Sequence, residues 1–183
     1  LLSKDDFEKS INFILDKQSL LITYHSTTLD EVEKVEKDFK NILEVLDELE
    51  STSLIFTKAN SDEGGRLIND MINEFLKTRS EKAIVFTSLG QLRYLSALQY
   101  VDAVFGNTSS GIVEAPSFKI GTINIGTRQK GRVQALSVIN STNEKQSIQN
   151  AIGKLYSDEF QSQLQSVVNP YGKGNSSYNT KEI

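Results

Sequence analysis

The chain has 183 residues, which suits one domain with a proper hydrophobic core. Hydrophobic residues make up 38% and charged residues 24%, and the formal net charge is −4 without a basic cluster, which argues against binding to nucleic acid or anionic membranes. Zero cysteines and one histidine exclude disulfides, cysteine nucleophiles and cysteine- or multi-histidine metal sites, so we expect neither a metal nor another cofactor.

The start of the chain lacks the features of a membrane-spanning or secreted protein. No apolar run approaches the roughly 20 residues that cross a bilayer. The first residues, LLSKDD, include no initiator methionine and do not follow the charged-then-apolar layout of a signal peptide. We therefore expect a segment of a longer, cytoplasmic protein.

The first 50 residues predict a helix, a buried strand and a second helix. Residues 3–12 suit a short helix, and the compact apolar run at 19–25 is typical of a strand buried on both faces. Thr28 and Glu31 have the spacing of a capping box, which satisfies two amides at a helix start. The helix that follows has apolar residues on one face, at Val32, Val35, Phe39, Ile42, Leu46 and Leu49.

The unit of strand and helix then recurs to the end of the chain. Further strands are predicted at 54–57, 83–87, 103–105, 121–125 and 137–139. Ser61 is placed to cap one helix, and others are predicted at 91–100, from Ser109, at 143–156 and at 158–167. This alternation predicts an α/β fold with a Rossmann-like, doubly wound parallel sheet and right-handed crossovers.

The predicted elements suggest a single domain with distinct ends. We expect a lead-in helix within residues 1–18 and a core at 19–168. The polar, glycine-rich tail at 169–183 is expected to fray, or to need a partner before it becomes ordered.

Polar residues follow the first five predicted strands. Ligands of open parallel sheets bind beyond the carboxyl ends of the strands, where the strand order reverses. The residues at those ends are His25, Asn60, Thr87 with Ser88, residues 107–110 and residues 126–128. This set suits a polar, anionic ligand.

Residues 106–114, GNTSSGIVE, carry the most informative pattern. Their two glycines permit tight turns and close backbone approach. The hydroxyls of Thr108, Ser109 and Ser110 can bind phosphate oxygens or cap the next helix, whose free amides favour anions. Glu114 follows about one helical turn later and can accept two ribose hydroxyls. An ordinary capped helix with a surface glutamate explains the same spacing.

Three further candidate site residues each allow a functional and a structural interpretation. In residues 126–132, GTRQKGR, Arg128 can grip phosphate through its planar guanidinium, or the segment is a solvated basic turn. His25 is either a ligand group at the first strand end or a structural histidine. Asn60 either binds a ligand or belongs to turn chemistry.

Four segments together resemble the hydrolysing UDP-N-acetylglucosamine 2-epimerase family. They are residues 20–25 (LLITYH), 106–114, 123–132 (INIGTRQKGR) and 169–172 (NPYG), in the family's order and with compatible spacing. The resemblance extends over residues 20–174, and the run at 126–132 is its most specific part. Thr108 stands where the family often has serine, which preserves the hydroxyl.

The resemblance implies the C-terminal half of a glycosyltransferase-B-type fold, in which two Rossmann-like domains enclose the active site. Such enzymes convert UDP-N-acetylglucosamine and water to N-acetylmannosamine and UDP, an early step towards sialic acids. UDP is first eliminated across C1–C2, and water then adds to the resulting 2-acetamidoglucal. The family's acid–base carboxylates and a phosphate-binding arginine belong to the N-terminal domain, which this chain does not supply. A homo-oligomer is compatible with the sequence.

Carried over by resemblance, Thr108 and Ser109 would hold the pyrophosphate, with amides near Ser110 helping, and Glu114 would hold the ribose diol. The same resemblance places further residues around the nucleotide: Arg128 near its end of the site, the backbone around Thr87 on the uracil edge, and Asn60 and His25 on the phosphates or sugar. His25 is the candidate for assisting the departure of UDP, since a protonated imidazole with a near-neutral pKa stabilises a leaving phosphate.

Three other functions compete with this interpretation. Non-hydrolysing epimerases tend to follow the strand-end histidine with Arg-Arg-Glu and to carry Glu-Arg-Pro in the later arginine motif, whereas here His25 precedes Ser26 and Arg128 precedes Gln129. A glycosyltransferase of similar architecture would require an acceptor sugar. A nucleotide-binding module without catalysis is the third.

Overall fold

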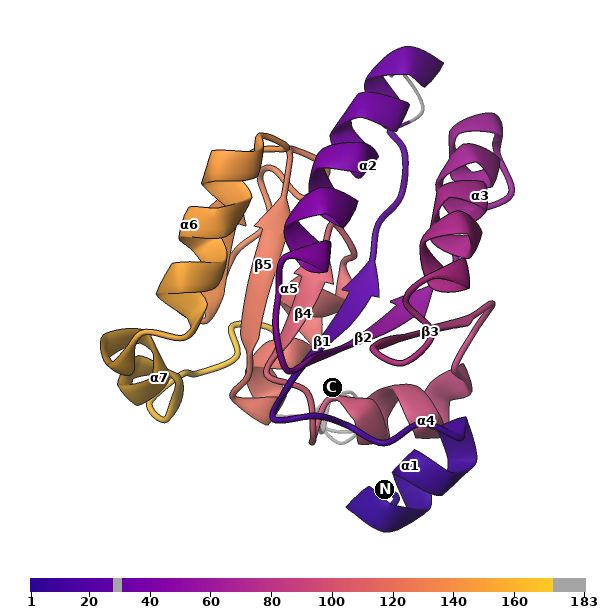
Figure 1. Ribbon diagram of the computed structural model, residues 1–183. Coiled ribbons are helices and arrows are strands. Elements are labelled where there is room, and N and C mark those ends of the chain that lie inside the picture. The colour runs from indigo at the N-terminus through magenta and orange to yellow at the C-terminus, as the bar shows by residue number, and fades with distance from the viewer. Residues whose placement is uncertain (28–30, 173–183) are drawn as a thin grey trace, which may run out of the picture.

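A computed structural model describes residues 1–27 and 31–172 of the chain (Figure 1). Its strands are β1 (Gln18–Thr23), β2 (Thr52–Thr57), β3 (Ala83–Phe86), β4 (Ala103–Gly106), β5 (Gly121–Ile125) and β6 (Val138–Ser141). Its helices are α1 (Lys4–Ile11), α2 (Val32–Asp47), α3 (Glu63–Lys77), α4 (Gly90–Ala97), α5 (Ser110–Val113), α6 (Lys145–Leu155) and α7 (Asp158–Leu164), with a 3-10 turn η1 at Ala115–Phe118.

The strands form one parallel sheet in the order β3-β2-β1-β4-β5-β6. This confirms the predicted doubly wound, Rossmann-like fold. The sixth strand begins and ends later than the predicted residues 137–139. The strand order reverses between β1 and β4, so the loops that follow these two strands flank the point where ligands of such sheets bind.

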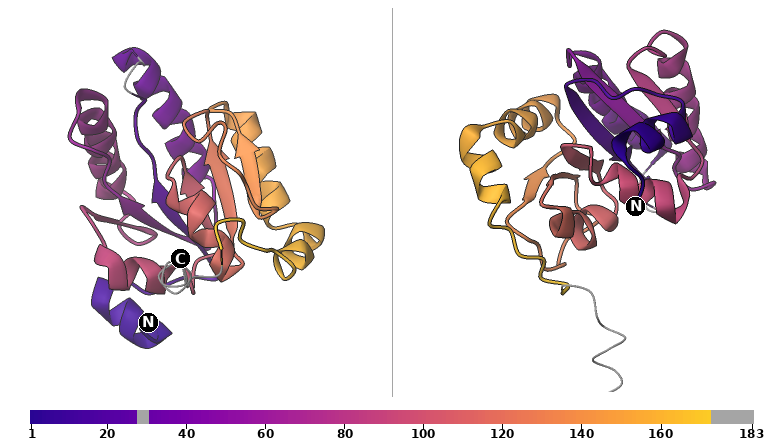
Figure 2. Two further views of the ribbon diagram at one scale, coloured as in Figure 1. Left: turned by 180° about the vertical axis from the view of Figure 1, so that it is seen from behind. Right: turned by 90° about the horizontal axis from the view of Figure 1, so that it is seen from below.

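The sheet separates two hydrophobic cores. Along β1, Leu20 and Ile22 pack into one core with residues of α2, α3 and α6, while Leu21 packs into the other with residues of α1 and α4. Successive strand residues point to opposite faces, so a continuous apolar strand fits a sheet covered on both sides. Both figures show α6 and α7, in orange to yellow, beside the part of the sheet that contains β5 and its edge strand β6, and α1 beside α4 (Figures 1 and 2).

The starts of two helices differ from the sequence prediction. The N-cap of α3 is Asp62, one residue after the predicted Ser61. The Oδ1 atom of Asp62 accepts a hydrogen bond of 2.7 Å from the Gly65 amide. A carboxylate at this position also interacts favourably with the positive end of the helix dipole. At α2, Glu31 precedes the helix and makes no side-chain cap bond, and Thr28 of the expected capping box lies outside the described residues.

The end of β4 lies unusually close to the end of β1. Gly106 has a φ of +130°, and a Cβ atom placed on it would lie 2.0 Å from the carbonyl oxygen of Thr23. The next amide, of Asn107, donates to that same oxygen at 3.1 Å. Both the backbone conformation and the lack of space therefore require glycine at position 106.

We predict that Gly106→Ala destabilises the chain by about 3 kcal/mol or more, because a side chain there meets backbone that cannot move aside without breaking the sheet. Chemical denaturation monitored by circular dichroism measures the change.

Gly153→Ala is the matched control for that substitution. Gly153 lies within α6, and a Cβ on it meets nothing within 4 Å. It should stabilise the chain by about 0.5–1 kcal/mol, as expected for glycine replaced by alanine in a helix. Equal effects of the two substitutions would contradict the close approach at Gly106.

Candidate functional site

Asn107 joins the two loops at the reversal of strand order. Its side chain is almost fully buried, at 2% exposure. Its Oδ1 accepts a hydrogen bond from the His25 amide, and its Nδ2 donates to the His25 carbonyl oxygen, both at 2.8 Å. The Asn107 carbonyl oxygen in turn accepts from Arg128 Nη1 at 3.1 Å and from Gln129 Nε2 at 2.8 Å. One residue thus fixes His25 and the turn at 126–132 relative to each other.

His25 lies half-buried beside this turn. Burial, followed by the charge of Arg128, lowers the pKa of the imidazole below its ordinary value of 6.5, and Asp62 opposes the shift. Its Nδ1 is buried without a hydrogen-bond partner within the described chain. The imidazole therefore favours its neutral form more than a free histidine does, since a buried cation beside a guanidinium is unfavourable.

A pocket of about 400 Å³ opens at the carboxyl ends of the strands. It brings together four of the predicted site residues: Thr87 after β3, Thr108 after β4, and Ser110 and Glu114 at the two ends of α5. Its walls combine hydroxyl groups, a carboxylate and apolar surface. Such a mixture suits a polar organic ligand that is fixed by a few convergent groups.

The hydroxyl-rich turn of this pocket is attached to β5. A Cβ atom on Gly111 would lie 2.7 Å from Thr122 Cγ2, so only glycine allows the turn to approach the strand this closely. The Thr122 hydroxyl donates to the Gly111 carbonyl oxygen at 2.6 Å. α5 is a short helix of a single turn at the place predicted near Ser109, and it ends at Glu114, whose carboxylate accepts a hydrogen bond from the Ser110 hydroxyl.

The remaining predicted residues lie outside this pocket. Arg128 lines a second hollow of about 450 Å³, beside β5 and β6, which also includes Asn107 and Asn143. His25, Asn60 and Ser109 line neither hollow. The side chains of Asn60 and Ser109 are exposed.

The structure adds three residues that the sequence did not single out. Lys58 and Tyr94 line the 400 Å³ pocket. Gln129 is only 3% exposed, whereas the three cations of the run at 126–132 are exposed, so the turn is solvated apart from this one buried side chain. Lys58 directly follows β2, and the rule that ligands bind at strand ends should have identified it. Tyr94 gave no such signal, because its place in α4 does not reveal what its hydroxyl contacts.

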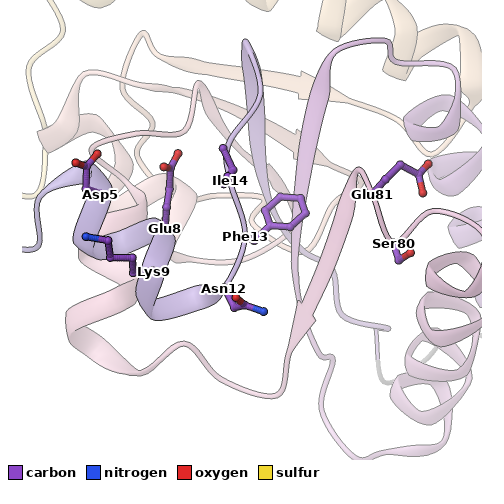
Figure 3. Close-up of a pocket in the computed structure, with 8 residues that line it drawn as sticks. All are labelled: Asp5, Glu8, Lys9, Asn12, Phe13, Ile14, Ser80 and Glu81. Carbon is purple, nitrogen blue, oxygen red and sulfur yellow. The ribbon is translucent and has the colours of Figure 1, made fainter.

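A larger hollow, of about 580 Å³, lies at the opposite edge of the sheet (Figure 3). Phe13 and Ile14 line it before β1, and Ser80 and Glu81 line it before β3, so it is at the amino ends of the strands. Figure 3 shows Asp5, Glu8 and Lys9 of α1 on one side and Glu81 on the other. Three carboxylates and one amine line this hollow, and this negative balance disfavours an anionic ligand. Its larger volume therefore does not make it the candidate ligand site.

Within residues 1–27 and 31–172, no group of three or more histidine, aspartate or glutamate side chains is placed to hold a metal ion. The same part of the chain contains no helix with the length and apolar character needed to cross a bilayer.

The sequence and the fold both match known proteins. Residues 1–183 match a family described as UDP-N-acetylglucosamine 2-epimerase. The GDP/UDP-N,N′-diacetylbacillosamine 2-epimerase (hydrolyzing) of Campylobacter jejuni is 46% identical over 159 residues, which are 87% of this chain and 41% of that protein. The chain spans less than half the length of the curated relatives it matches.

Two solved structures define the fold further. The UDP-GlcNAc 2-epimerase from Neisseria meningitidis, bound to UDP-GlcNAc, matches with a TM-score of 0.77 over 98% of this chain and 48% of that one, at 19% identity. The C-terminal domain of a group 1 glycosyl transferase from Francisella tularensis matches with a TM-score of 0.56 over 97% of this chain and 94% of that one, at 10% identity. The chain therefore has the fold of one glycosyltransferase-B-type domain.

We predict that the NMR titration of His25, the only histidine, has a midpoint below 6.5. Arg128→Gln should raise the midpoint, because it removes a nearby positive charge. Asp62→Asn should lower it while keeping a good helix cap. A wild-type midpoint at or above 6.5, or no response to Arg128→Gln, would show that the imidazole does not experience this environment.

The lowered pKa also predicts how stability depends on pH. The unfolded chain binds the proton more tightly than the folded chain, so the His25 contribution is fully present above about pH 6.5 and is lost as the pH falls towards the folded midpoint. Denaturation at several pH values should show this loss in the wild type, and the His25→Gln variant should lack it. Identical pH profiles for the two proteins would refute the linkage.

Proposed function

Because the chain belongs to the UDP-N-acetylglucosamine 2-epimerase family, we propose that it forms the UDP-binding half of a hydrolysing 2-epimerase. The proposed reaction turns UDP-N-acetylglucosamine and water into N-acetylmannosamine and UDP. The C1–O bond breaks as the proton leaves C2, and water then adds its oxygen to C1 and a proton to C2 from the opposite face. The observation that supports this proposal best is the pocket that collects Thr87, Thr108, Ser110 and Glu114 at the reversal of strand order.

The proposed roles combine the family resemblance with the residues that line the pocket, Ser109 being assigned by resemblance alone because it lies outside the pocket. Glu114 accepts the ribose hydroxyls, and the backbone around Thr87 contacts the uracil edge. Thr108 and Ser109 bind the pyrophosphate together with nearby amides. Lys58 adds a positive charge at the pocket wall, which would favour a diphosphate.

His25 and Arg128 are proposed to act on the leaving group. Arg128 is held against the Asn107 carbonyl oxygen and offers its guanidinium to phosphate charge. In this structure burial and Arg128 lower the pKa of the His25 imidazole and so favour its neutral form. A diphosphate beside it would stabilise the imidazolium and raise that pKa. Ligand binding would thus create the protonated group that assists the departure of UDP. Asn60, in the loop after β2, is proposed to face the phosphates or the sugar.

The sugar part of the substrate has two candidates. The 46% identity to the Campylobacter jejuni enzyme, which is named for GDP/UDP-N,N′-diacetylbacillosamine, favours a nucleotide-linked N,N′-diacetylbacillosamine as an alternative substrate of the same reaction type. The pocket is proposed to hold the nucleotide, so its residues do not select between the two sugars. A place in sialic-acid-type sugar biosynthesis and a cytoplasmic location belong to the same proposal.

We predict that the 183-residue chain binds UDP only weakly and has no turnover. A dissociation constant near 1 mM corresponds to about −4 kcal/mol, a reasonable share for one face of a cleft. When an N-terminal half from a relative is joined to it, UDP and a free 2-acetamido sugar with inverted C2 should form from one of the two nucleotide sugars. Chromatography and NMR of the products measure this.

Three results would redirect the functional assignment. Interconversion of two UDP-sugars without release of UDP would indicate a non-hydrolysing epimerase. Turnover only with an acceptor sugar would indicate a glycosyltransferase. Binding of UDP without any reaction in the joined protein would leave a nucleotide-binding module.

We predict that Glu114→Ala weakens UDP binding about tenfold or more, as expected for the loss of charge-assisted hydrogen bonds. The free energy of unfolding should change by less than about 0.5 kcal/mol, because the side chain is exposed. Amide shifts of the labelled chain during titration with UDP, and with ATP for comparison, measure binding.

Glu48→Ala provides a matched control for Glu114→Ala. Glu48 is also exposed and also accepts one side-chain hydrogen bond, from Gln149 Nε2 at 2.9 Å, but it lies at the end of α2. It should leave UDP binding unchanged. If Glu114→Ala collapses the melting transition, the glutamate is structural and the proposed ribose contact is wrong.

A further inference from the structure

Tyr94 connects α4 to the hydroxyl-rich turn of the pocket. Its phenol oxygen is hydrogen-bonded to the Ser110 hydroxyl, and the Ser110 hydroxyl is hydrogen-bonded to Glu114 Oε2. All three residues line the same pocket of about 400 Å³. We refer to Tyr94, Ser110 and Glu114 as the hydroxyl relay.

The direction of the hydroxyl relay follows from the number of protons available. An ionised carboxylate only accepts hydrogen bonds, so the single proton of the Ser110 hydroxyl must point to Glu114. Ser110 Oγ can then only accept from Tyr94, whose phenol must be the donor. Both protons therefore point from the partly buried tyrosine towards the exposed carboxylate.

Tyr94 is well suited to remain the donor. Burial raises the pKa of its phenol to about 12; the charge of Glu114 adds to the rise and the hydrogen bond with Ser110 opposes it. The phenol therefore keeps its proton throughout the physiological range. Its ring lies on a helix packed against the sheet, whereas Glu114 ends a helix of one turn and is exposed.

We infer that Tyr94 is a positioning residue that fixes the Glu114 carboxylate, through Ser110, for recognition of a vicinal diol. This inference rests on the proposed binding of UDP. A free glutamate side chain loses rotamer entropy when it binds a ligand, and a carboxylate already held by a hydrogen bond loses less. One oxygen, Oε1, and the remaining lone pairs of Oε2 stay available for the two ribose hydroxyls.

The hydroxyl relay also changes the role of Ser110. Its only hydroxyl proton is committed to Glu114, so this hydroxyl is not a donor to phosphate. Its amide already donates to Thr108 Oγ1 at 3.4 Å. Recognition of the ribose and recognition of the pyrophosphate are therefore separated along the turn, with Ser110 on the ribose side.

The test compares UDP with 2′-deoxy-UDP, which lacks one of the two hydroxyls. The wild-type chain should prefer UDP by about tenfold, the effect of one charge-assisted hydrogen bond. Tyr94→Phe keeps the ring and removes the hydroxyl, so the preference should fall to about twofold or threefold through weaker UDP binding, with 2′-deoxy-UDP little affected. NMR titration of each variant with each nucleotide measures both dissociation constants.

Two further variants keep the test informative if Tyr94→Phe folds poorly. Ser110→Ala interrupts the hydroxyl relay without altering the Tyr94 ring and should reduce the preference equally. Tyr100→Phe is the control, because it also removes a hydrogen-bonded phenol, which donates to the Leu2 carbonyl oxygen at 2.7 Å away from the pocket. It should retain the wild-type preference.

The outcomes separate this inference from the proposed function. An unchanged preference in Tyr94→Phe or Ser110→Ala would overturn the positioning role while leaving UDP binding intact. An equal loss of affinity for both nucleotides would assign Tyr94 a merely structural role. A wild-type chain that does not prefer UDP over 2′-deoxy-UDP would remove the diol contact itself, and the inference with it.

Discussion

The pair of hydrogen bonds between the Asn107 side chain and the His25 backbone is the interaction on which the site depends. It joins the loops that follow the neighbouring strands β1 and β4, where the strand order reverses. Because Asn107 is buried, water cannot hydrogen-bond to its side chain in place of His25. Loss of either hydrogen bond would therefore leave a buried polar group unsatisfied. The Asn107 carbonyl oxygen also accepts hydrogen bonds from Arg128 and Gln129, so the backbone of His25 and the guanidinium of Arg128 are held by the same residue.

Close backbone approach is the second constraint, and two glycines provide it. Gly106 brings the end of β4 against Thr23 of β1, and Gly111 brings the hydroxyl-rich turn against Thr122 of β5. With the turn fixed at both ends, its hydroxyls and the carboxylate of Glu114 open into one pocket with Thr87. The affinity for a ligand then depends on groups that are already in place before binding, which reduces the entropy lost when it binds.

Burial and then the nearby charge of Arg128 lower the pKa of the His25 imidazole, and the charge of Asp62 opposes the shift. Under the proposed function, a diphosphate beside the imidazole would offset the charge of Arg128. In the proposed enzyme this chain therefore contributes binding of the leaving group, while the acid–base carboxylates that the family resemblance assigns to the N-terminal half would act on the sugar.

The sequence by itself determined the fold class, the order of the strands and helices, and the polar strand ends. Buried parallel strands leave continuous apolar runs, and a parallel sheet brings all its carboxyl ends to one edge, so residues such as Thr87 and Thr108 were predictably near each other. Only the tertiary structure decided which side chains meet. Tyr94 contacts Ser110 because of how α4 is rotated against the sheet, and Asp62 rather than Ser61 caps α3 because of where that helix begins. The lowered pKa of His25 likewise depends on burial and on the distance to Arg128, which no local pattern in the sequence records.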